Sequence, residues 1–420
     1  MAKRAAEPDL YPVGERPPLG MVPALMHGWL VRRERYGDPR QAFQAEVIET
    51  PEPEEGEVLV YVMAAGINYN GLWACQARPL DVIALRRRRG AAEDFHIAGS
   101  EGSGIVYKLG PGVRGLEVGD EVAIHGSQWD SGCPTVLAGG DPVHSPTFRA
   151  WGYESNWGTF AQFAKPQAHQ CFRKPRRLTW EDAASYMAAG GSAWRMLHGH
   201  AGHTLSQGDV VLVWGGAGGL GSLAIQIARA AGARPVAVVS SEEKFEFCLR
   251  IGAVGCIDRT RFTHWGQLPS WDDAAAYDRW LEGARAFGEA VWEAAGERAS
   301  PRLVVEHPGE DTLPTSLYVC APGGMVVLCG GTTGYNGTLD LRYLWIRQKR
   351  LQGSHAFGDE EALRVTELID RRRIDPTLSR TFAFEELAAA HGLMAENRHP
   401  HGNMAVLIGA PGPGQGARES

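Results

Sequence analysis

The stretch that decides the fold runs from Asp209 to Ser240 and reads DVVLVWGGAGGLGSLAIQIARAAGARPVAVVS. Residues 209–214 form a continuous β-branched and apolar run, as in a parallel strand buried on both faces. Residues 220–233 have a helical pattern, and residues 234–240 form a second apolar run. Strand, helix and strand in this order predict a βαβ unit of a doubly wound α/β domain.

A glycine motif joins the first strand to the helix: Gly216-Ala217-Gly218-Gly219-Leu220-Gly221, which has the spacing G-x-G-x-x-G. In this context Gly216 permits the tight turn, Gly218 lets the backbone approach a pyrophosphate, and Gly221 lets the helix pack closely on the strand. Amide groups at the helix N-terminus then face the phosphates. The pattern predicts a dinucleotide site at these six residues; the alternative is a glycine-rich turn without a ligand.

The residues after the second strand indicate which dinucleotide is bound. NAD enzymes place an acidic residue there to bind the ribose 2′-hydroxyl. This chain has Ser240 and Ser241, then Glu242 and Glu243, then Lys244. The serines and Lys244 suit a 2′-phosphate and predict NADPH, whereas the two glutamates argue against it. Lys244 has the alternative of a solvated lysine at the start of a helix.

The rest of the chain has a different pattern on each side of this unit. Glycine and proline punctuate short strands from about 28 to 125, as in an all-β barrel or roll. The segment 126–163 is irregular, and loops of this length are usually functional. Further elements are expected as follows: a helix at 179–200, strands at 302–307 and 323–331, helices at 359–373 and 384–396, and a strand at 404–409 that returns to the first domain.

Composition narrows the class of protein. The 420 residues are 44% hydrophobic and carry 42 basic against 49 acidic residues, for a net charge of −7. This balance excludes a disordered chain and argues against a nucleic-acid or membrane partner, both of which favour a basic face. The seven cysteines are scattered without a C-x-x-C pair, so we expect reduced thiols and a cytoplasmic protein. The arm at 1–27 lacks the apolar core of a secretion signal.

The order of a barrel, a nucleotide domain and a short return resembles the medium-chain dehydrogenase/reductase superfamily. Its alcohol dehydrogenases ligate zinc through a Cys after an early Gly-Ile/Val and through the His of G-H-E-x-x-G. The matching stretches here are Gly66-Ile67-Asn68-Tyr69-Asn70 and Gly99-Ser100-Glu101-Gly102. Catalytic zinc needs three ligands, typically Cys, His or carboxylate. We therefore expect no metal, and hydride delivery to an activated double bond of an enoyl-thioester or a quinone.

Four longer motifs resemble the crotonyl-CoA carboxylase/reductase family: AWGYESNWGTF at 150–160, WGQLP at 265–269, EHPGE at 306–310 and QKRLQGSH at 348–355. The resemblance covers about 28–409. It implies a GroES-like β-barrel catalytic domain plus a doubly wound Rossmann nucleotide-binding domain. The expected boundaries are 1–27 for an N-terminal arm, 28–190 for the first part of the catalytic domain, 191–358 for the NADPH-binding domain, and 359–420 for the return and C-terminal tail.

The resemblance implies NADPH-dependent reductive carboxylation of an α,β-unsaturated acyl-CoA, with CO2, to an alkylmalonyl-CoA, in a homo-oligomer (dimer or tetramer). Water or an acid near the α-carbon would protonate the enolate, whereas an asparagine amide is a neutral donor. Asn70 fits this role, and Asn68 stays open. The resemblance also places the backbone amide of Tyr153, and a water held by Glu154 and His355, around the CO2. The alternatives are a non-carboxylating enoyl-thioester reductase and a non-catalytic NADPH-binding protein.

Two features concern the acyl-CoA. Arg347, Lys349 and Arg350 form a basic cluster that is expected to contact the CoA phosphates, unless it is a solvated strand edge or a subunit contact. Gly190 and Gly191 stand where relatives carry bulkier residues, and they predict an acyl pocket wider than crotonyl requires. In the competing interpretation, Trp194 fills that space. The family's aromatic residue after the histidine is replaced here by Ala356.

Overall fold

The structure is a computed structural model that describes residues 8–202 and 205–418. It forms two compact units. Unit 1 holds Ala188 and the residues before it, Gly358–Thr366, and the residues from Leu378 onward; unit 2 holds Ala189–Phe357 and Glu367–Thr377. Within the described residues, no helix combines the length and apolarity of a membrane span.

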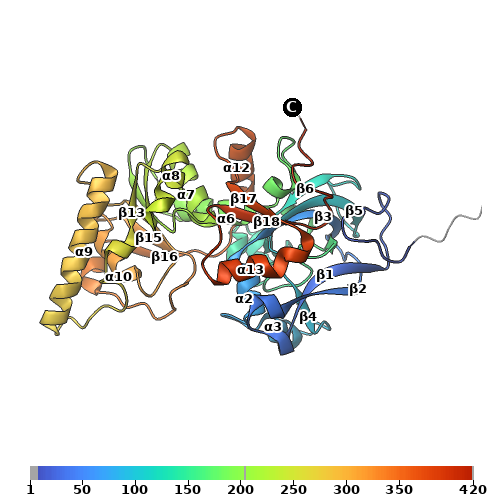
Figure 1. Cartoon of the computed structure of the whole chain (residues 1–420), viewed down its shortest axis with the longest axis horizontal. Helices are drawn as coiled ribbons and strands as arrows, with labels where there is room; N and C mark the ends of the chain where they lie inside the picture. The colour runs from blue at the N-terminus through green and yellow to red at the C-terminus, as the bar shows by residue number, and fades with distance from the viewer. Residues whose placement is uncertain (1–7, 203–204, 419–420) are drawn as a thin grey trace, which may run out of the picture. The chain divides into compact units, whose positions relative to one another are not determined.

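Unit 1 is built on β3 (Val58–Ile67), a strand whose ten residues are all buried. It lies inside a seven-stranded sheet of order β10-β6-β5-β3-β18-β17, with β9 also paired to β3 (Figure 1). β18 (Asn403–Leu407) runs antiparallel to β3, which confirms that the last predicted strand returns to the first domain. The other strands of this sheet are β5 (Gly102–Leu109), β6 (Glu121–Ile124), β9 (Phe163–Ala164), β10 (Cys171–Arg173) and β17 (Leu378–Phe382).

Smaller elements complete unit 1. One sheet joins β2 (Phe43–Glu49), β1 (Leu25–Arg32) and β4 (Phe95–Ile97), and another pairs β7 (Ser127–Gln128) with β8 (Arg149–Ala150). The segment expected to be irregular contains, besides these short strands, the one-turn helix α4 (Pro134–Leu137). The other helices are α1 (Pro39–Ala42), α2 (Tyr69–Cys75), α3 (Val82–Arg88), α5 (Trp180–Ala183) and α13 (Leu387–Ala395).

Unit 2 is the predicted doubly wound domain. Its six strands are all parallel in the order β13-β12-β11-β14-β15-β16, and β11 to β12 is the βαβ unit read from the sequence. The strands are β11 (Val210–Trp214), β12 (Arg234–Val239), β13 (Gly255–Asp258), β14 (Leu303–Glu306), β15 (Met325–Leu328) and β16 (Arg350–Gly353). The helices are α7 (Gly219–Ala230), α8 (Phe245–Arg250), α9 (Ala274–Ala295), α10 (Leu313–Val319) and α11 (Leu341–Trp345).

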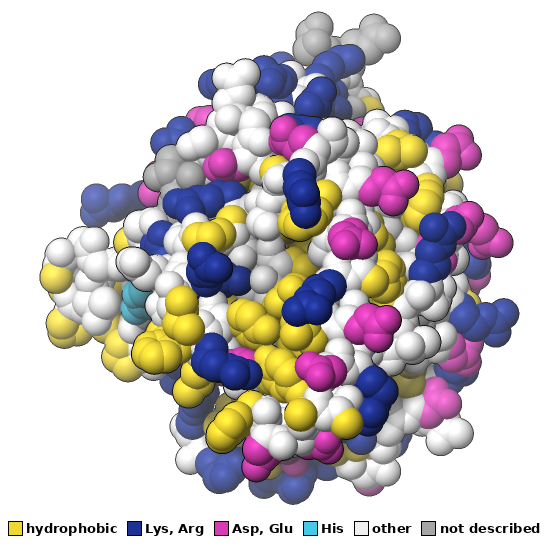
Figure 2. Space-filling view, turned by 90° about the vertical axis from the view of Figure 1, so that its left-hand side faces the viewer, with side chains coloured by type: hydrophobic (Ala, Val, Ile, Leu, Met, Phe, Trp, Pro, Cys, Tyr) yellow, Lys and Arg dark blue, Asp and Glu magenta, His cyan; other side chains and the backbone are white. Residues whose placement is uncertain are grey.

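The longest helix of unit 2, α9, was not predicted. It packs on β12, β13 and α10 (Figure 1). Asp273 caps its first turn, and Gly296 ends it in a left-handed conformation with φ 71°. The side of the molecule on which Figure 1 draws α9 is shown in Figure 2, where apolar side chains gather in a hollow and charged side chains of both signs surround them.

The tail segment expected to belong wholly to the first domain is divided between the units. α12 (Asp359–Asp370) starts in unit 1, but Glu367–Thr377 groups with unit 2. The reason is a set of hydrogen bonds from α7. The amide of Gln226 accepts from the Asp375 backbone N at 2.8 Å and donates to the Asp375 O at 3.0 Å, and the Ser222 and Thr377 hydroxyls lie 2.9 Å apart.

The helix expected at 179–200 is two helices, α5 and α6 (Met187–His198). Thr179 caps α5 as predicted, because its hydroxyl accepts from the Asp182 amide. The chain bends after Ala183, and the second helix begins where the Ala188 amide donates to a carboxylate oxygen of Glu101 at 2.8 Å. A buried acid in unit 1 therefore fixes the start of α6.

Residues 413–418, near the end of the described chain, form a strap across β10 and α5 in unit 1. The buried ammonium of Lys174 donates to the Leu178 O at 2.7 Å and to the Gly416 O at 2.9 Å. The Trp180 amide donates to the Gln415 O at 2.9 Å. A side chain at Gly416 would meet the Trp180 indole, since a Cβ there would lie 2.6 Å from Nε1. The strap thus satisfies a buried charge.

Candidate functional site

The glycine motif lies between β11 and α7 in unit 2, as the sequence predicts. A Cβ at Gly216 would lie 2.7 Å from the Cβ of Ala237, and one at Gly221 would lie 2.2 Å from the Gly215 carbonyl oxygen. Both positions therefore need glycine for packing. The sheet order reverses between β11 and β14, and ligands of open α/β sheets bind at the carboxyl ends of strands at such a point. These residues form a cradle that fits a dinucleotide.

The predicted 2′-phosphate residues lie together after β12. The Lys244 ammonium donates to the Ser240 hydroxyl at 2.8 Å, and Ser241 precedes the short helix that contains Lys244. Glu242 forms an ion pair with Arg261. Sequence reasoning missed Arg261, although basic residues directly after the neighbouring strand were a readable signal.

The EHPGE motif begins at the last residue of β14, the strand beside β11 in the sheet. The Glu306 carboxylate is fully buried and accepts from the Gly309 amide at 3.1 Å, the Thr312 hydroxyl at 2.7 Å and the Ser316 hydroxyl. Burial raises its pKa to about 7 although these hydrogen bonds act to lower it. The ring of His307 occupies the space beside Gly215, where a Cβ would lie 2.3 Å from Nε2.

The two candidate asparagines of unit 1 have different partners at the start of α2. The Asn68 amide donates to the Glu101 carboxylate at 2.6 Å, whereas the Asn70 amide donates to the Ser100 hydroxyl at 3.2 Å. Glu101 is buried, and burial raises its pKa to about 7 despite hydrogen bonds from Ala188 and Asn68. Asn68 therefore holds a carboxylate, and Asn70 lies beside a neutral group.

The loop that contains Glu154 is closed on itself. The Glu154 carboxylate accepts from the Ala150 amide at 2.9 Å, and the Glu154 backbone amide donates to the Ala150 O at 2.7 Å. The Tyr153 amide also points to the Ala150 O, at 3.2 Å, and the Tyr153 hydroxyl donates to the Arg78 O at 2.8 Å. The role of the Tyr153 amide at the CO2 stays a prediction.

This loop packs on the turn that carries Ser100. A Cβ at Gly152 would lie 2.2 Å from the Gly99 O, and one at Gly126 would lie 2.4 Å from the Ser100 O. The Trp151 amide donates to the Gly126 O at 2.7 Å. Unit 1 thus brings the Asn70–Ser100 pair and the start of the Glu154 loop to one turn. His355 is an exposed residue of unit 2 that follows β16, and its role remains a prediction.

The basic cluster in unit 2 is not a uniform cationic patch. The Lys349 ammonium is buried and donates to the Leu317 O at 2.7 Å and the Tyr318 O at 3.0 Å. Burial lowers its pKa to about 8. These carbonyls lie in the last turn of α10, where a cation is favoured. Lys349 is therefore a structural residue rather than the CoA contact we expected, whereas Arg347 is exposed and Arg350 half-buried.

The predicted widening of the acyl pocket meets an obstacle at Gly191. A Cβ there would lie 2.5 Å from the ring of Phe357, so the space that this glycine leaves is already occupied. Phe357 is itself buried. The expectation of free volume is corrected at Gly191, and the filling residue is Phe357 rather than Trp194. Gly190 is buried in the same helix and remains a candidate.

A group with metal-ligand chemistry lies elsewhere in unit 1. His125, His169 and Asp359 have donor atoms within 4.8 Å of one another. The Asp359 carboxylate lies 3.0 Å from His125 Nε2 and from His169 Nδ1. The Ser127 amide donates to His125 Nδ1, so the ring proton of neutral His125 is on Nε2 and points at Asp359. Metal-bound histidines donate their second N–H outward, and His125 has the opposite arrangement. The group is a hydrogen-bonded triad.

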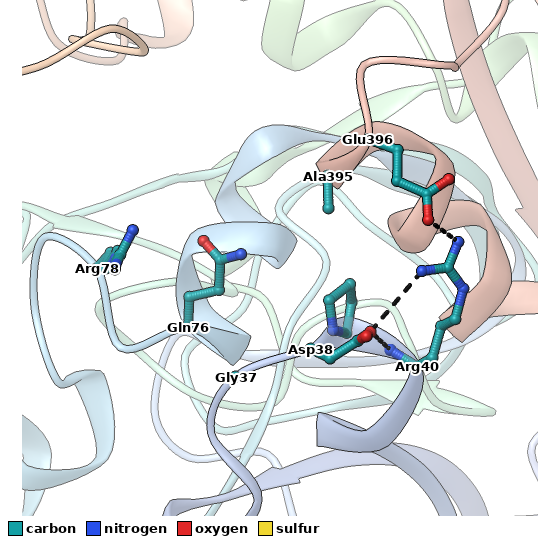
Figure 3. A pocket seen from close by; sticks show the side chains of 8 residues that line it. Gly37, Asp38, Arg40, Gln76, Arg78, Ala395 and Glu396 are labelled. Atoms are coloured by element: carbon teal, nitrogen blue, oxygen red, sulfur yellow. Dashed lines mark hydrogen bonds and ion pairs between the residues drawn. The ribbon is translucent and has the colours of Figure 1, made fainter.

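Unit 1 also carries an open pocket of about 350 Å³ beyond the end of α2 (Figure 3). Arg40 lies between Glu396, at 2.7 Å, and Asp38, at 3.9 Å, while Arg78 lies apart from this group. Two arginines and two carboxylates give the pocket no net charge. The lining residues are Gly37, Asp38, Pro39, Arg40, Gln76, Arg78, Ala395 and Glu396.

Comparison with known proteins shows the family of the chain. The family model described as alcohol dehydrogenase GroES-like domain matches residues 54–176, and that described as zinc-binding dehydrogenase matches 219–371. A crotonyl-CoA carboxylase/reductase of Cereibacter sphaeroides is 49% identical over 99% of this chain and 95% of that protein. The chain belongs to the crotonyl-CoA carboxylase/reductase family.

Solved structures of crotonyl-CoA carboxylase/reductases agree with this assignment. The structure of AntE in complex with NADP is 56% identical, with a TM-score of 0.93 over 97% of this chain and 100% of that one. The 2-octenoyl-CoA carboxylase reductase CinF, in complex with NADP and 2-octenoyl-CoA, is 35% identical, with a TM-score of 0.86 over 95% of this chain and 91% of that one. The predicted resemblance and fold class are confirmed.

Membership of the crotonyl-CoA carboxylase/reductase family resolves an apparent conflict with the zinc-binding description. Near the position of the zinc-ligating cysteine of alcohol dehydrogenases this chain has two asparagines, Asn68 and Asn70, and at the position of the zinc-ligating histidine it has Ser100. Amide and hydroxyl groups are not the thiolates, imidazoles and carboxylates that hold catalytic zinc. The family model therefore reports the common fold here.

Proposed function

We propose that this protein is an NADPH-dependent enoyl-CoA carboxylase/reductase that converts an α,β-unsaturated acyl-CoA and CO2 to an alkylmalonyl-CoA. The observation that carries the proposal is the Asn70–Ser100 hydrogen bond, which joins the serine at the histidine position of the zinc motif to an asparagine near the cysteine position. A neutral amide and a neutral hydroxyl there polarise no alcohol, but they bind an uncharged acceptor without supplying a proton. The match to crotonyl-CoA carboxylase/reductases over nearly the whole chain supports it.

The cofactor fits the residues of unit 2. The glycine motif lies at the carboxyl end of β11, where the order of the parallel sheet reverses, and Ser240 and Lys244 lie together after β12. When bound, NADPH supplies a hydride to the β-carbon of the substrate. The electron pair then lies on the α-carbon and the thioester oxygen, and the α-carbon forms a new bond to the carbon of CO2, whose oxygens take the charge as a carboxylate.

The residues of unit 1 act on the acceptor and on water. Asn70 donates a hydrogen bond toward CO2 with its second amide hydrogen, while the first is held by Ser100. For Glu154 and for His355 we keep the role that the family resemblance implies, the binding of an ordered water. Glu101, the acid nearest in sequence to Ser100, has its carboxylate oxygens bound by Asn68 and Ala188. The Glu101 carboxyl is therefore held away from protonating the carbanion of the substrate.

The acyl chain is the finer part of the proposal. Relatives named for crotonyl-CoA and for 2-octenoyl-CoA share this fold. With the space at Gly191 filled by Phe357, a preference for long or branched chains rests on Gly190. Turnover of C4, C8 and branched enoyl-CoAs measures it; a strict C4 preference removes the wide pocket from the proposal and leaves the reaction class unchanged.

The decisive experiment follows NADPH oxidation with and without saturating bicarbonate and weighs the acyl-CoA product. We expect bicarbonate to add the mass of one CO2. Reduction without that gain assigns the protein to the alternative class of non-carboxylating enoyl-thioester reductases. Tight NADPH binding without oxidation by any enoyl-CoA identifies a non-catalytic binding protein.

A further inference from the structure

The edge of the sheet that is proposed to bind the 2′-phosphate carries more charge than Lys244. β12 and β13 run parallel, with Val239 opposite Asp258, so Ser240 and the residues after Asp258 leave the sheet at the same edge. The segment after Asp258 is the short helix Arg259–Arg261. The end of β13 therefore places two arginines beside the end of β12.

Arg261 reaches across this edge to Glu242, with which it forms an ion pair. Both side chains are largely exposed, at 64% and 58%. Exposed pairs of this kind contribute little to folding. Their electrostatic effect is local instead: the guanidinium cancels a carboxylate that stands two residues after Ser240, close to where NAD enzymes place the acid that excludes a 2′-phosphate.

The charges explain why Glu242 is compatible with NADPH. A 2′-phosphate carries about two negative charges near pH 7, and an uncompensated carboxylate beside it repels it. Lys244 is oriented toward Ser240, at 2.8 Å, and supplies an attractive charge. With Glu242 paired to Arg261, the carboxylate nearer in sequence to Ser240 no longer opposes the attraction by Lys244.

We propose that Arg261 is a positioning residue for cofactor selectivity, which holds Glu242 as an ion pair so that Ser240 and Lys244 bind the 2′-phosphate. The inference rests on the proposed function in one respect, that NADPH is the cofactor. Arg261 acts through Glu242, so its effect disappears when Glu242 carries no charge.

The test measures dissociation constants of the full-length protein for NADPH and for NADH by tryptophan fluorescence at low salt. Arg261→Ala is expected to weaken NADPH binding about five- to tenfold and NADH binding less than about twofold. In Glu242→Gln/Arg261→Ala, NADPH affinity returns to within about twofold of the wild type. Arg261→Lys keeps the charge and most of the NADPH affinity.

Arg234→Ala is the matched control, because it breaks the ion pair with Glu297 at the opposite end of β12. We expect it to leave the ratio of the two affinities unchanged. Equal losses of NADPH and NADH binding in Arg261→Ala, or a double variant as weak as Arg261→Ala, overturn the inference while the wild type still prefers NADPH. A wild type without that preference overturns the proposed cofactor, and this inference with it.

Discussion

Asn70 and Ser100 bear on the reaction because neither side chain is acidic enough to protonate the carbanion of the substrate. An imidazolium or a carboxylic acid at these positions transfers a proton to a carbanion, and the product is then the saturated thioester. Glu101, whose pKa is raised to about 7, is such an acid, and the structure turns its oxygens toward Asn68 and Ala188. Neutral donors at Asn70 and Ser100, together with a Glu101 carboxyl held by Asn68 and Ala188, therefore favour carboxylation over protonation.

Asn70→Ala is expected to shift the product from carboxylated toward merely reduced acyl-CoA, by about tenfold or more in ratio, while NADPH oxidation continues. Asn68→Ala instead lowers the free energy of unfolding by about 1–3 kcal/mol, because it removes a donor from the buried Glu101 carboxylate. Product masses and thermal melts separate the two. If Asn68→Ala alone changes the product ratio, the assignment is reversed.

Glu154 and His355 provide a second prediction at this scale. Glu154→Ala and His355→Ala are expected to lower the carboxylated fraction, because each removes a partner of the proposed water. Glu154→Gln is the matched control, since its amide oxygen still accepts from the Ala150 amide and keeps the loop closed. An unchanged product ratio in both alanine variants would remove them from the CO2 site.

At the scale of elements, the connection from β14 to α10 makes the stability of the fold depend on pH, through Glu306. The folded state keeps the Glu306 pKa near 7, above its ordinary value, so between about pH 4.5 and 7 the folded protein binds more protons than the unfolded chain. Stability from this group is therefore present at low pH and is lost as the pH rises through 7. Glu101 acts in the same direction.

Glu306→Gln isolates this effect. Its amide oxygen can still accept from Gly309 and Thr312, and it does not ionise. Relative to the wild type, we expect the variant to gain stability between pH 5 and pH 8, by up to roughly 3 kcal/mol. Urea midpoints at the two pH values measure it. A difference between variant and wild type that does not change with pH contradicts the prediction.

The elements differ in how far sequence predicts them. β11, α7 and β12 were predicted correctly. Close packing requires glycine at Gly216 and Gly221, and these glycines form a recognisable motif between β11 and α7. α9 was missed because Gly283 and Gly288 interrupt its pattern. The structure explains Gly283: a Cβ there would lie 2.5 Å from His264.

The candidate site likewise contains features that the sequence predicted and features that it did not. Asn70 followed from a motif read along the chain. The burial of Lys349 and the filling of Gly191 by Phe357 depend on contacts between residues far apart in sequence, and no local pattern reports them.

At the scale of the whole molecule, unit 2 has a terminal strand, β16, for which β15 is the paired strand within the described residues. β16 ends the sheet order, and three exposed side chains near it in sequence are apolar: Trp345 at 68%, Ile346 at 60% and Leu351 at 37% exposure. Unpaired edges beside apolar surface favour pairing with another chain. This supports the predicted homo-oligomer, whose size remains a prediction.

The double variant Trp345→Glu/Ile346→Glu is expected to reduce the mass in solution from that of a dimer or tetramer to a smaller species, since it places charge on the apolar surface beside β16. Light scattering after gel filtration measures the mass. Leu249→Glu, on exposed α8 of the same unit, is the control and should leave it unchanged. A wild type that is monomeric contradicts the prediction.

The strap over Lys174 has a consequence for protein engineering. Exchanging segments between relatives is a direct way to transfer acyl-chain preference, and a junction after β18 looks convenient because it falls past the last strand. Such a junction would separate Gly416 from the ammonium whose charge it satisfies. A chimera that takes β10 and α5 from one parent therefore needs residues 413–418 from the same parent, or it carries a buried lysine without the Gly416 carbonyl.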